Sequence, residues 1–301
     1  MAAMNDTLRG RLERTVVDAR DVAEAGARAA LEALAVHHHD PFPHQTPDQR
    51  KLRNHLRARA RQAGDQQNHR GEVEIKHLSA ECAYEYWHRM LFARFLAENH
   101  FLIEPKSGVA ISLEECEELA REAGIDTWTF ASRCAQSMLP QIFRPDDPLL
   151  QVAFAQEHRR RLEALLTGLD KTVFVTDDAL GWVYQFWQSK RKDEVNADGG
   201  KIDADSLSPV TQLFTDHYMV LFLLHNTLGA WYAAHVLRRD QELAASAIDE
   251  ESLRKAISTR LGFVYSLEYL RFVRDQSGLW RPAAGSFEKW PQKVADLRVI
   301  D

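Results

Sequence analysis

Apolar residues recur every three or four positions along the first 35 residues of the chain. This spacing places them on one face of a helix, and charged residues fill the opposite face. The pattern predicts a long amphipathic helix over Asn5–Ala35, with Gly26 as a candidate position for a break. The apolar positions are Leu8, Leu12, Val16, Ala19, Val22, Ala23, Ala27, Ala30, Leu31 and Leu34.

Residues that form turns are scarce in the whole chain. Only 14 glycines and 10 prolines occur among 301 residues, and their sum of about 8% lies below the usual level of about 12%. Hydrophobic residues make up 45% and charged residues 27%, as in soluble globular proteins. This composition excludes a disordered chain, a collagen and a coiled-coil rod. We therefore expect a mostly α-helical fold.

Further helices are predicted from apolar spacing and from residues that favour helix starts. Thr46-Pro-Asp-Gln49 and Ser112-Leu-Glu-Glu115 each match a capping box, and Ser79 is a candidate cap for an aromatic-rich helix over His77–Phe101. The other expected helices are Ile125–Leu139, Pro148–Leu166, a helix capped by Thr176-Asp-Asp178 that runs through Trp187 to Glu194, Asp216–Leu237 with Thr215 as its cap, and Asp249–Ser258.

The remaining segments are expected to be loops or short strands. Gly64–Gly71 is predicted as a flexible linker, Asn196–Ser208 as a polar loop and Arg274–Trp290 as irregular. Gly262–Val273 is ambiguous between helix and strand, and Leu297–Asp301 has the apolar character of a short buried strand. The chain then divides into residues 1–70 with a basic helix and linker, residues 71–207 as a helical domain, and residues 208–301 as a connector.

Six basic residues fall within Arg50–Arg61, a stretch of twelve residues that contains no acid. Arginines that neutralise phosphates release counterions, so this helix is a candidate contact for the DNA backbone. The alternatives are a solvated face, or a face paired with the acidic helix Glu114–Glu122. The net charge of −6 argues against coating nucleic acid by bulk charge. The residues that share one helix face by spacing are Arg50, Arg53, Arg57 and Arg61.

Other chemically suggestive groups have simpler interpretations. His37–His39 and His44 lack a set of Cys, Asp or Glu at structural-zinc spacing, so a solvated loop is favoured over a metal site. The aromatic residues of Tyr84–Phe95 and Trp182–Trp187 follow helical spacing, which favours core over a platform for nucleic-acid bases. No GxGxxG, Walker loop, HExxH or nucleophilic triad is recognisable, so no catalytic residue is assigned.

The cysteine pattern points to a reducing compartment. Cys82, Cys116 and Cys134 are odd in number and lack CxxC spacing, so we expect free thiols. The most apolar stretch, Met219–Leu224, is far shorter than the roughly 20 residues that a membrane span requires. No signal peptide is recognisable, and we expect a cytoplasmic protein without a membrane partner.

The segment Ser208-Pro-Val-Thr-Gln-Leu-Phe-Thr215 resembles the Q-x-F-T-P segment of N6-adenine DNA methyltransferases, which precedes their catalytic domain. In that family the segment packs beside the S-adenosylmethionine site. A Thr-capped helix start offers N–H groups to a carboxylate, which fits that role. Asp216 stands where the family usually has proline, so an acid would lie near the cofactor carboxylate. The residues that the resemblance places beside the cofactor are Thr211, Gln212, Phe214 and Thr215, with Thr215 the best candidate for direct contact.

Two further segments carry the same resemblance. Gly181-Trp-Val-Tyr-Gln-Phe-Trp187, with Lys192-Asp-Glu-Val195, is similar to the G-W-x-Y-Q-aromatic helix of the large methyltransferases of BREX phage defence and of fused restriction–modification enzymes. Glu81-Cys-Ala-Tyr-Glu-Tyr-Trp87, followed by Arg89 and Phe92-Ala-Arg-Phe95, resembles their upstream aromatic helix. The resemblance covers about three quarters of the chain, from His77 to Asp301.

In this family a strand that ends in Asp leads into the D-P-x-x-G-S-G loop that holds S-adenosylmethionine. Leu297–Asp301 resembles that strand, and Asp301 resembles its final residue, which would contact the cofactor. The sequence lacks the glycine loop and the N-P-P-Y tetrapeptide that grips a flipped adenine. The resemblance therefore implies the front part of a longer methyltransferase, with residues 208–301 as connector and incomplete start of the α/β catalytic domain.

Three function hypotheses remain. The first is the non-catalytic part of an adenine-specific DNA methyltransferase from a phage-defence or restriction system, inactive and without tightly bound cofactor by itself. Its partners would be double-stranded DNA, the catalytic and target-recognition part, and defence-system subunits. The second is a freestanding helical adaptor or decoy that binds a methyltransferase or defence partner. The third is DNA binding through the basic helix alone, which predicts salt-sensitive binding that falls when Arg53 and Arg57 are changed to Glu.

Overall fold

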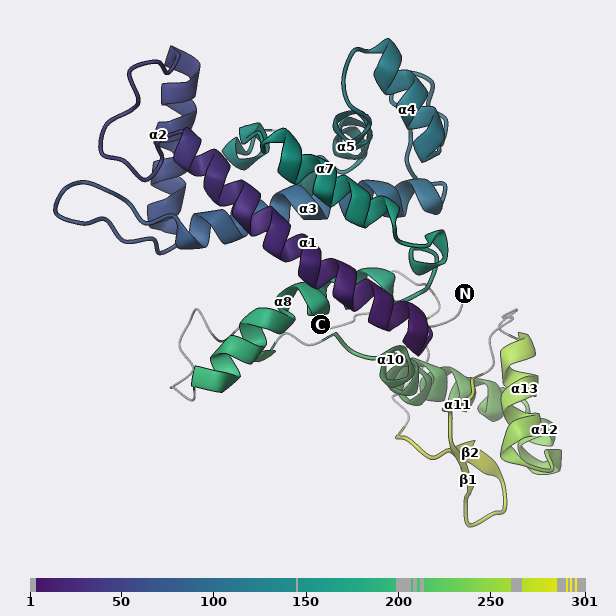
Figure 1. Cartoon of the computed structure of the whole chain (residues 1–301). Coiled ribbons are helices and arrows are strands. Elements are labelled where there is room, and N and C mark those ends of the chain that lie inside the picture. Colours follow the sequence, from purple (N-terminus) through teal and green to yellow (C-terminus); the bar gives the residue numbers. More distant parts are fainter. Residues whose placement is uncertain are drawn as a thin grey trace. The chain divides into compact units, whose positions relative to one another are not determined.

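The structure is a computed structural model that describes residues 4–144, 146–198, 207, 210–211, 214–260, 267–285, 291, 293 and 296. The chain divides into two compact units, residues 1–214 and residues 215–301, and each is described by itself (Figure 1). Helices dominate both units, and the described residues hold one two-stranded sheet. The prediction of a mostly α fold is confirmed.

The first unit contains the longer helices. Its elements are α1 (Asp6–Ala33), α2 (Pro47–Gln62), α3 (Lys76–Glu98), α4 (Leu113–Glu122), α5 (Thr127–Met138), α6 (Pro140–Phe143), the 3₁₀ turn η1 (Pro148–Gln151), α7 (Gln156–Thr167), the 3₁₀ turn η2 (Lys171–Val173) and α8 (Ala179–Asp198). The elements of the second unit are α10 (His217–Leu224), the π-helical turn η3 (His225–Gly229), α11 (Ala230–Arg239), α12 (Gln241–Ser246), α13 (Glu250–Arg260), β1 (Phe272–Arg274) and β2 (Trp280–Pro282).

Helix α1 lies at the centre of the first unit and packs against α3, α7 and α8. It continues unbroken through Gly26, so the candidate break there is wrong. Gly26 instead permits close packing, because a Cβ at this position would lie 2.8 Å from the Phe154 ring and 3.0 Å from Cβ of His158. The buried face is rich in small residues, and it consists of Leu12, Val16, Ala19, Val22, Ala23, Gly26, Ala27, Ala30 and Leu31.

Both predicted capping boxes are present. At the start of α2, the Thr46 hydroxyl accepts the N–H of Gln49 at 3.2 Å, and the Gln49 side-chain oxygen accepts the N–H of Thr46 at 3.0 Å. Ser112 and Glu115 make the same reciprocal pair at the start of α4. Each pair satisfies N–H groups that the helix itself cannot, which is why these starts are visible in the sequence.

The predicted cap of α3 is wrong, because this helix begins three residues before Ser79. The buried carboxylate of Asp65 accepts the N–H groups of His77 and Leu78, each at 2.9 Å. Asp65 reaches the helix because the intervening chain folds back, with the N–H of Glu74 donating to the carbonyl of Gln66 at 2.9 Å. The predicted flexible linker is therefore a hydrogen-bonded turn, and it contains two glycines with positive φ.

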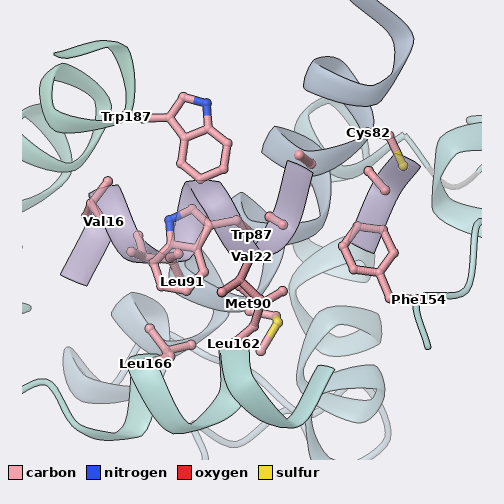
Figure 2. Close-up of a cluster of buried hydrophobic side chains, with 14 of the residues drawn as sticks. Val16, Val22, Cys82, Trp87, Met90, Leu91, Phe154, Leu162, Leu166 and Trp187 are labelled. Carbon is pink, nitrogen blue, oxygen red and sulfur yellow. The ribbon is translucent and has the colours of Figure 1, made fainter. Parts of the chain in front are cut away.

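Helices α3 and α8 supply the large aromatic side chains of the main core. Trp87 is only 1% exposed, and Phe186 and Trp187 are also buried. Figure 2 shows Trp87, Leu162 and Val22 in one cluster of buried side chains. For these aromatic residues the prediction of a core role is confirmed, because a base-stacking platform requires exposed rings.

The predicted helix over Pro148–Leu166 is interrupted. Between η1 and α7 the chain is extended at Val152, and both Val152 and Phe154 are buried. Residues two apart on an extended segment point the same way, so both side chains reach the core. In a helix, residues two positions apart point to nearly opposite sides, so a continuous helix would not turn both side chains the same way.

A smaller core joins the end of α3 to α4 and α5. It includes Ala93, Leu102 and Phe143, together with the thiols of Cys116 and Cys134. All three cysteines are free, as predicted, and the structure shows that all three are buried.

In the second unit, α10, η3 and α11 form one continuous helical stretch. It corresponds to the predicted helix Asp216–Leu237, but its N-cap is Asp216 and not Thr215, and no side chain caps it. The core of this unit is built on α11, α13 and the hairpin; its members include Ala230, Ala233, Leu253, Ile257, Leu270 and Phe272. None of the α10 side chains is buried.

Strands β1 and β2 pair antiparallel, with Val273 opposite Arg281. The prediction of an irregular chain after Arg274 is therefore wrong for β2. The strands are too short to show an alternating pattern, and contacts across the hairpin and with the end of α12 hold them instead. The Arg274 guanidinium lies 4.5 Å from the Trp280 ring centroid, and the Trp280 indole N–H donates to the carbonyl of Ala247 at 2.8 Å.

Among the described residues one helix, His217–Arg239, is long and apolar enough to cross a membrane. Length and composition alone are weak grounds, because the core helix of a soluble protein passes the same test. The last predicted strand, Leu297–Asp301, lies outside the described residues.

Candidate functional site

Phe214 lies directly on helix α8, within the first unit. A Cβ on Gly181 would overlap the Phe214 ring, so the ring occupies the space that the missing side chain leaves free. The edge of Trp182 meets the same ring at a centroid distance of 5.2 Å. The backbone N–H of Phe214 donates to the side-chain oxygen of Gln185 at 2.9 Å. Phe214 thus meets the Gly181–Trp187 segment through Gly181, Trp182 and Gln185.

The start of α8 is fixed by a buried carboxylate. Asp178 accepts the indole N–H of Trp182 at 2.8 Å and the backbone N–H of Met4 at 2.9 Å. The Arg9 guanidinium lies 5.0 Å from the Trp182 ring centroid. The platform that receives Phe214 is therefore tied to the first residues of α1, a link that the sequence pattern did not reveal.

Of the other residues predicted beside a cofactor, the structure describes Thr211 and Thr215. Thr211 is exposed, and its hydroxyl donates to the carbonyl of Leu207 at 2.7 Å. Thr215 is exposed at the first position of the second unit. Gln212 and Asp301 lie outside the described residues. The structure thus brings Phe214 to α8 but does not join the predicted residues into one pocket within the part of the chain that it describes.

The four arginines that the spacing placed on one face of α2 differ in their burial. Arg53 is 3% exposed and Arg57 is 7% exposed, although the spacing predicted them on an outer face with Arg50 and Arg61. Burial lowers the pKa of both guanidinium groups. Arg50 and Arg61 are exposed, and Arg50 donates to the carbonyl of Pro43 at 3.3 Å.

The two buried arginines hold the loop between α1 and α2. Arg53 donates to the carbonyls of Ala35 and His39, each at 2.8 Å. Arg57 donates to the carbonyls of Val36 and Gly71, each at 2.7 Å. Both also donate to the carbonyl of His38. Their donors are thus directed at this chain's own backbone, which matches neither a solvated face nor pairing with the acidic helix.

The histidine loop contains no metal cluster among the residues that the structure describes. His39 contacts Asp40 at 3.0 Å on the surface, and burial lowers the pKa of His37. The loop's order comes instead from Arg53 and Arg57. Sequence spacing alone could not reveal this, because a basic face and a row of carbonyl-binding arginines have the same periodicity.

Two known proteins are similar to parts of this chain. No protein-family profile matches the chain. It is 23% identical over 232 residues to an adenine-specific methyltransferase named PglX from Lacticaseibacillus casei (strain Zhang), which covers 61% of this chain and 19% of that protein. It is 33% identical over 73 residues to an adenine-specific methyltransferase named BrxX from Escherichia coli O9:H4 (strain HS), which covers 23% of this chain and 6% of that protein.

The similarity covers only part of this chain and only a small part of each relative. The matched region spans about a fifth of the length of the first relative and much less of the second. The chain is therefore related in part to adenine-specific methyltransferases.

Proposed function

We propose that this chain is the non-catalytic N-terminal portion of an S-adenosylmethionine-dependent, adenine-specific DNA methyltransferase of a phage-defence or restriction–modification system. The seating of Phe214 on Gly181 carries the proposal, because it joins two segments that each resemble this family. The similarity to PglX over 232 residues supports the same assignment. In this role the helical unit braces the chain segment that leads toward the catalytic domain.

The cofactor contacts belong to the proposal as well. Bound S-adenosylmethionine would supply the methyl group in the complete enzyme. Thr211, Gln212, Phe214 and Thr215 would border it, and Asp301 would end the strand before the glycine loop. The α10 N-terminus fits a carboxylate, since its first N–H groups have no side-chain cap. The carboxylate of Asp216 beside them opposes an anion, so we expect no tight binding by this chain alone.

Two measurements test this proposal. The DNA downstream of codon 301, or an adjacent gene, should encode the glycine loop and an N-P-P-Y tetrapeptide. The purified chain should transfer no tritiated methyl groups from S-adenosylmethionine to unmethylated DNA, whereas the complete enzyme should. Robust methylation by the 301-residue chain would refute the non-catalytic role.

The alternative function is a freestanding helical adaptor or decoy that binds a methyltransferase or defence partner. The exposed apolar side chains of α10, including Tyr218, Phe222 and Leu223, favour it, because such a surface usually contacts another protein. The adaptor should bind a purified adenine methyltransferase in analytical ultracentrifugation, and F222D with L223D should abolish that binding. A downstream reading frame with the glycine loop would favour the first function instead.

DNA contact by α2 is also part of the proposal. Changing Arg53 and Arg57 to Glu is not a clean test of it, because both residues are buried. R53E and R57E would disrupt the loop, so any loss of binding could reflect misfolding. R50E with R61E reverses two exposed charges and should reduce salt-sensitive DNA binding, measured by fluorescence anisotropy at two salt concentrations. Unchanged binding by this double variant would remove the helix from the DNA interface.

A further inference from the structure

A cavity of about 360 Å³ lies within the first unit. Its walls come from α3, α5, the extended segment before α7 and the first turn of α7. Met90 and Phe154, both labelled in Figure 2, form part of its lining. The volume falls within the range of about 300–1,000 Å³ that is typical of small-molecule sites.

Arg89 of α3 lies in the cavity wall and has no ion pair with any residue that the structure describes. Among the described residues it makes one hydrogen bond, from Nε to the backbone carbonyl of Glu85 at 3.3 Å, so both terminal nitrogens are without an acceptor there. Its guanidinium carbon lies 5.8 Å from the Tyr86 ring centroid. Burial lowers the pKa of this guanidinium, which reflects the cost of holding the charge there. The nearby Glu85 carboxyl does not pair with it, and burial raises the pKa of that carboxyl. A half-buried cation with free donors is stabilised when an anion pairs with it.

Two other arginines line the same cavity. Arg133 of α5 makes no hydrogen bond or ion pair within the described chain, and Arg159 lies 3.5 Å from Asp126. Asp126 is the single carboxylate in the lining, so the cavity carries an excess of positive charge. Guanidinium groups bind phosphate oxygens through paired N–H donors.

An aromatic wall accompanies these cations. Tyr86 stacks on Phe154 with ring centroids 3.9 Å apart, so one of its faces is already covered. Trp128 of α5 is half-buried in the lining, and its indole N–H meets no acceptor in the part of the chain that the structure describes. The side chains of Ser132 and Gln151 also make no hydrogen bond with a described residue. Aromatic rings of this kind stack on nucleic-acid bases, typically with about 1–3 kcal/mol per base.

We propose that this cavity binds a nucleoside phosphate, with the phosphate at Arg89 and Arg133 and the base against Trp128. The combination of free guanidinium donors and a half-buried indole in one lining distinguishes this ligand from a simple anion, which requires no aromatic wall. The inference does not depend on the proposed function, because it concerns α3, α5 and α7 and not the Phe214 contact. The nucleotide comes from solution or from the phosphorylated end of a single strand.

Isothermal titration calorimetry with the full chain tests this proposal. The probes are AMP, ATP, adenosine, inorganic phosphate and a short 5′-phosphorylated single-stranded oligonucleotide. AMP or ATP should bind saturably, and adenosine and phosphate should each bind at least about tenfold more weakly, since each lacks one half of the contacts. Stronger binding of the oligonucleotide than of both free nucleotides would support the site and identify a strand end as the source.

Single substitutions distinguish a loss of ligand contacts from a loss of folding. R133Q should weaken AMP binding about threefold and R89M about tenfold or more, whereas R161Q, on the exposed part of α7 outside the cavity, should have no effect. Because R89M removes a half-buried residue, its melting temperature is measured beside R133Q, which alters an exposed side chain. Equal affinities for phosphate and AMP, no saturable binding of any probe, or equal effects of R133Q and R161Q would each overturn the proposal.

Discussion

Gly181 matters because the Phe214 ring fills the space where its side chain would lie. Substitution G181A should displace Phe214 and lower the free energy of unfolding by about 1–3 kcal/mol, despite the gain in helix propensity of about 1 kcal/mol. In an F214A background the clash is gone, so G181A should then be neutral or stabilising. Urea denaturation of the four proteins measures this coupling. Equal effects of G181A in both backgrounds would contradict the seating of Phe214.

Arg57 is predicted to stabilise the fold and not to serve as a spare surface charge. Substitution R57M removes hydrogen bonds to the carbonyls of Val36, His38 and Gly71. It leaves the buried Val36 carbonyl without a donor among the described residues, whereas Arg53 still donates to His38 and Gln67 still donates to Gly71. We expect a loss of about 2–4 kcal/mol of unfolding free energy. R61M changes an exposed arginine of the same helix and should cost less than about 0.5 kcal/mol. Similar stability of the two variants in urea denaturation would refute this role.

At the scale of elements, the start of α3 depends on a residue outside the helix. D65A should lower the free energy of unfolding by about 1–2 kcal/mol, because the N–H groups of His77 and Leu78 lose their acceptor. S79A should be neutral or stabilising, because the buried Ser79 hydroxyl has no hydrogen-bond partner among the residues that the structure describes. Thermal unfolding followed by circular dichroism compares the two variants. A larger loss of stability from S79A than from D65A would instead support Ser79 as the cap, as the sequence predicted.

The cysteines on α3, α4 and α5 give a pH-dependent prediction. Burial raises the pKa of Cys82 and Cys116 to about 12 and that of Cys134 to about 11. The folded chain therefore holds neutral thiols between pH 7 and 9, and alkylation by iodoacetamide should follow unfolding instead of rising with thiolate content. Above the ordinary thiol pKa only the unfolded state ionises, so stability should fall as the pH rises past that value. Rapid labelling of the folded chain at pH 8 would contradict this burial.

At the scale of the whole molecule, two compact units with separate cores predict separable unfolding. L253A removes a fully buried side chain of the second unit, and L162A does the same in the first. Each should cost about 2–5 kcal/mol in its own unit and leave the other transition unchanged. Differential scanning calorimetry resolves the two transitions. A single transition that both variants lower equally would show one cooperative unit.

The candidate site was predictable in part. The family resemblance selected Phe214 and the Gly181–Trp187 segment, and the structure brings these together through the ring, Gly181 and Gln185. It did not reveal Asp178, whose carboxylate ties the site to Met4, because that contact joins positions far apart in the sequence. The cavity around Arg89 was also missed, since it forms only where three helices meet.

The sequence by itself determined where most helices lie and how two of them start. Apolar spacing and capping boxes act within one or two turns, so Thr46 and Ser112 reveal their helices without the rest of the chain. Only the tertiary structure decided that Arg53 and Arg57 face inward, that Asp65 caps α3 and that β2 exists. These outcomes depend on acceptors, donors and strands supplied by distant segments. Residue spacing records the period of an element, but it does not record which partner its polar groups will meet.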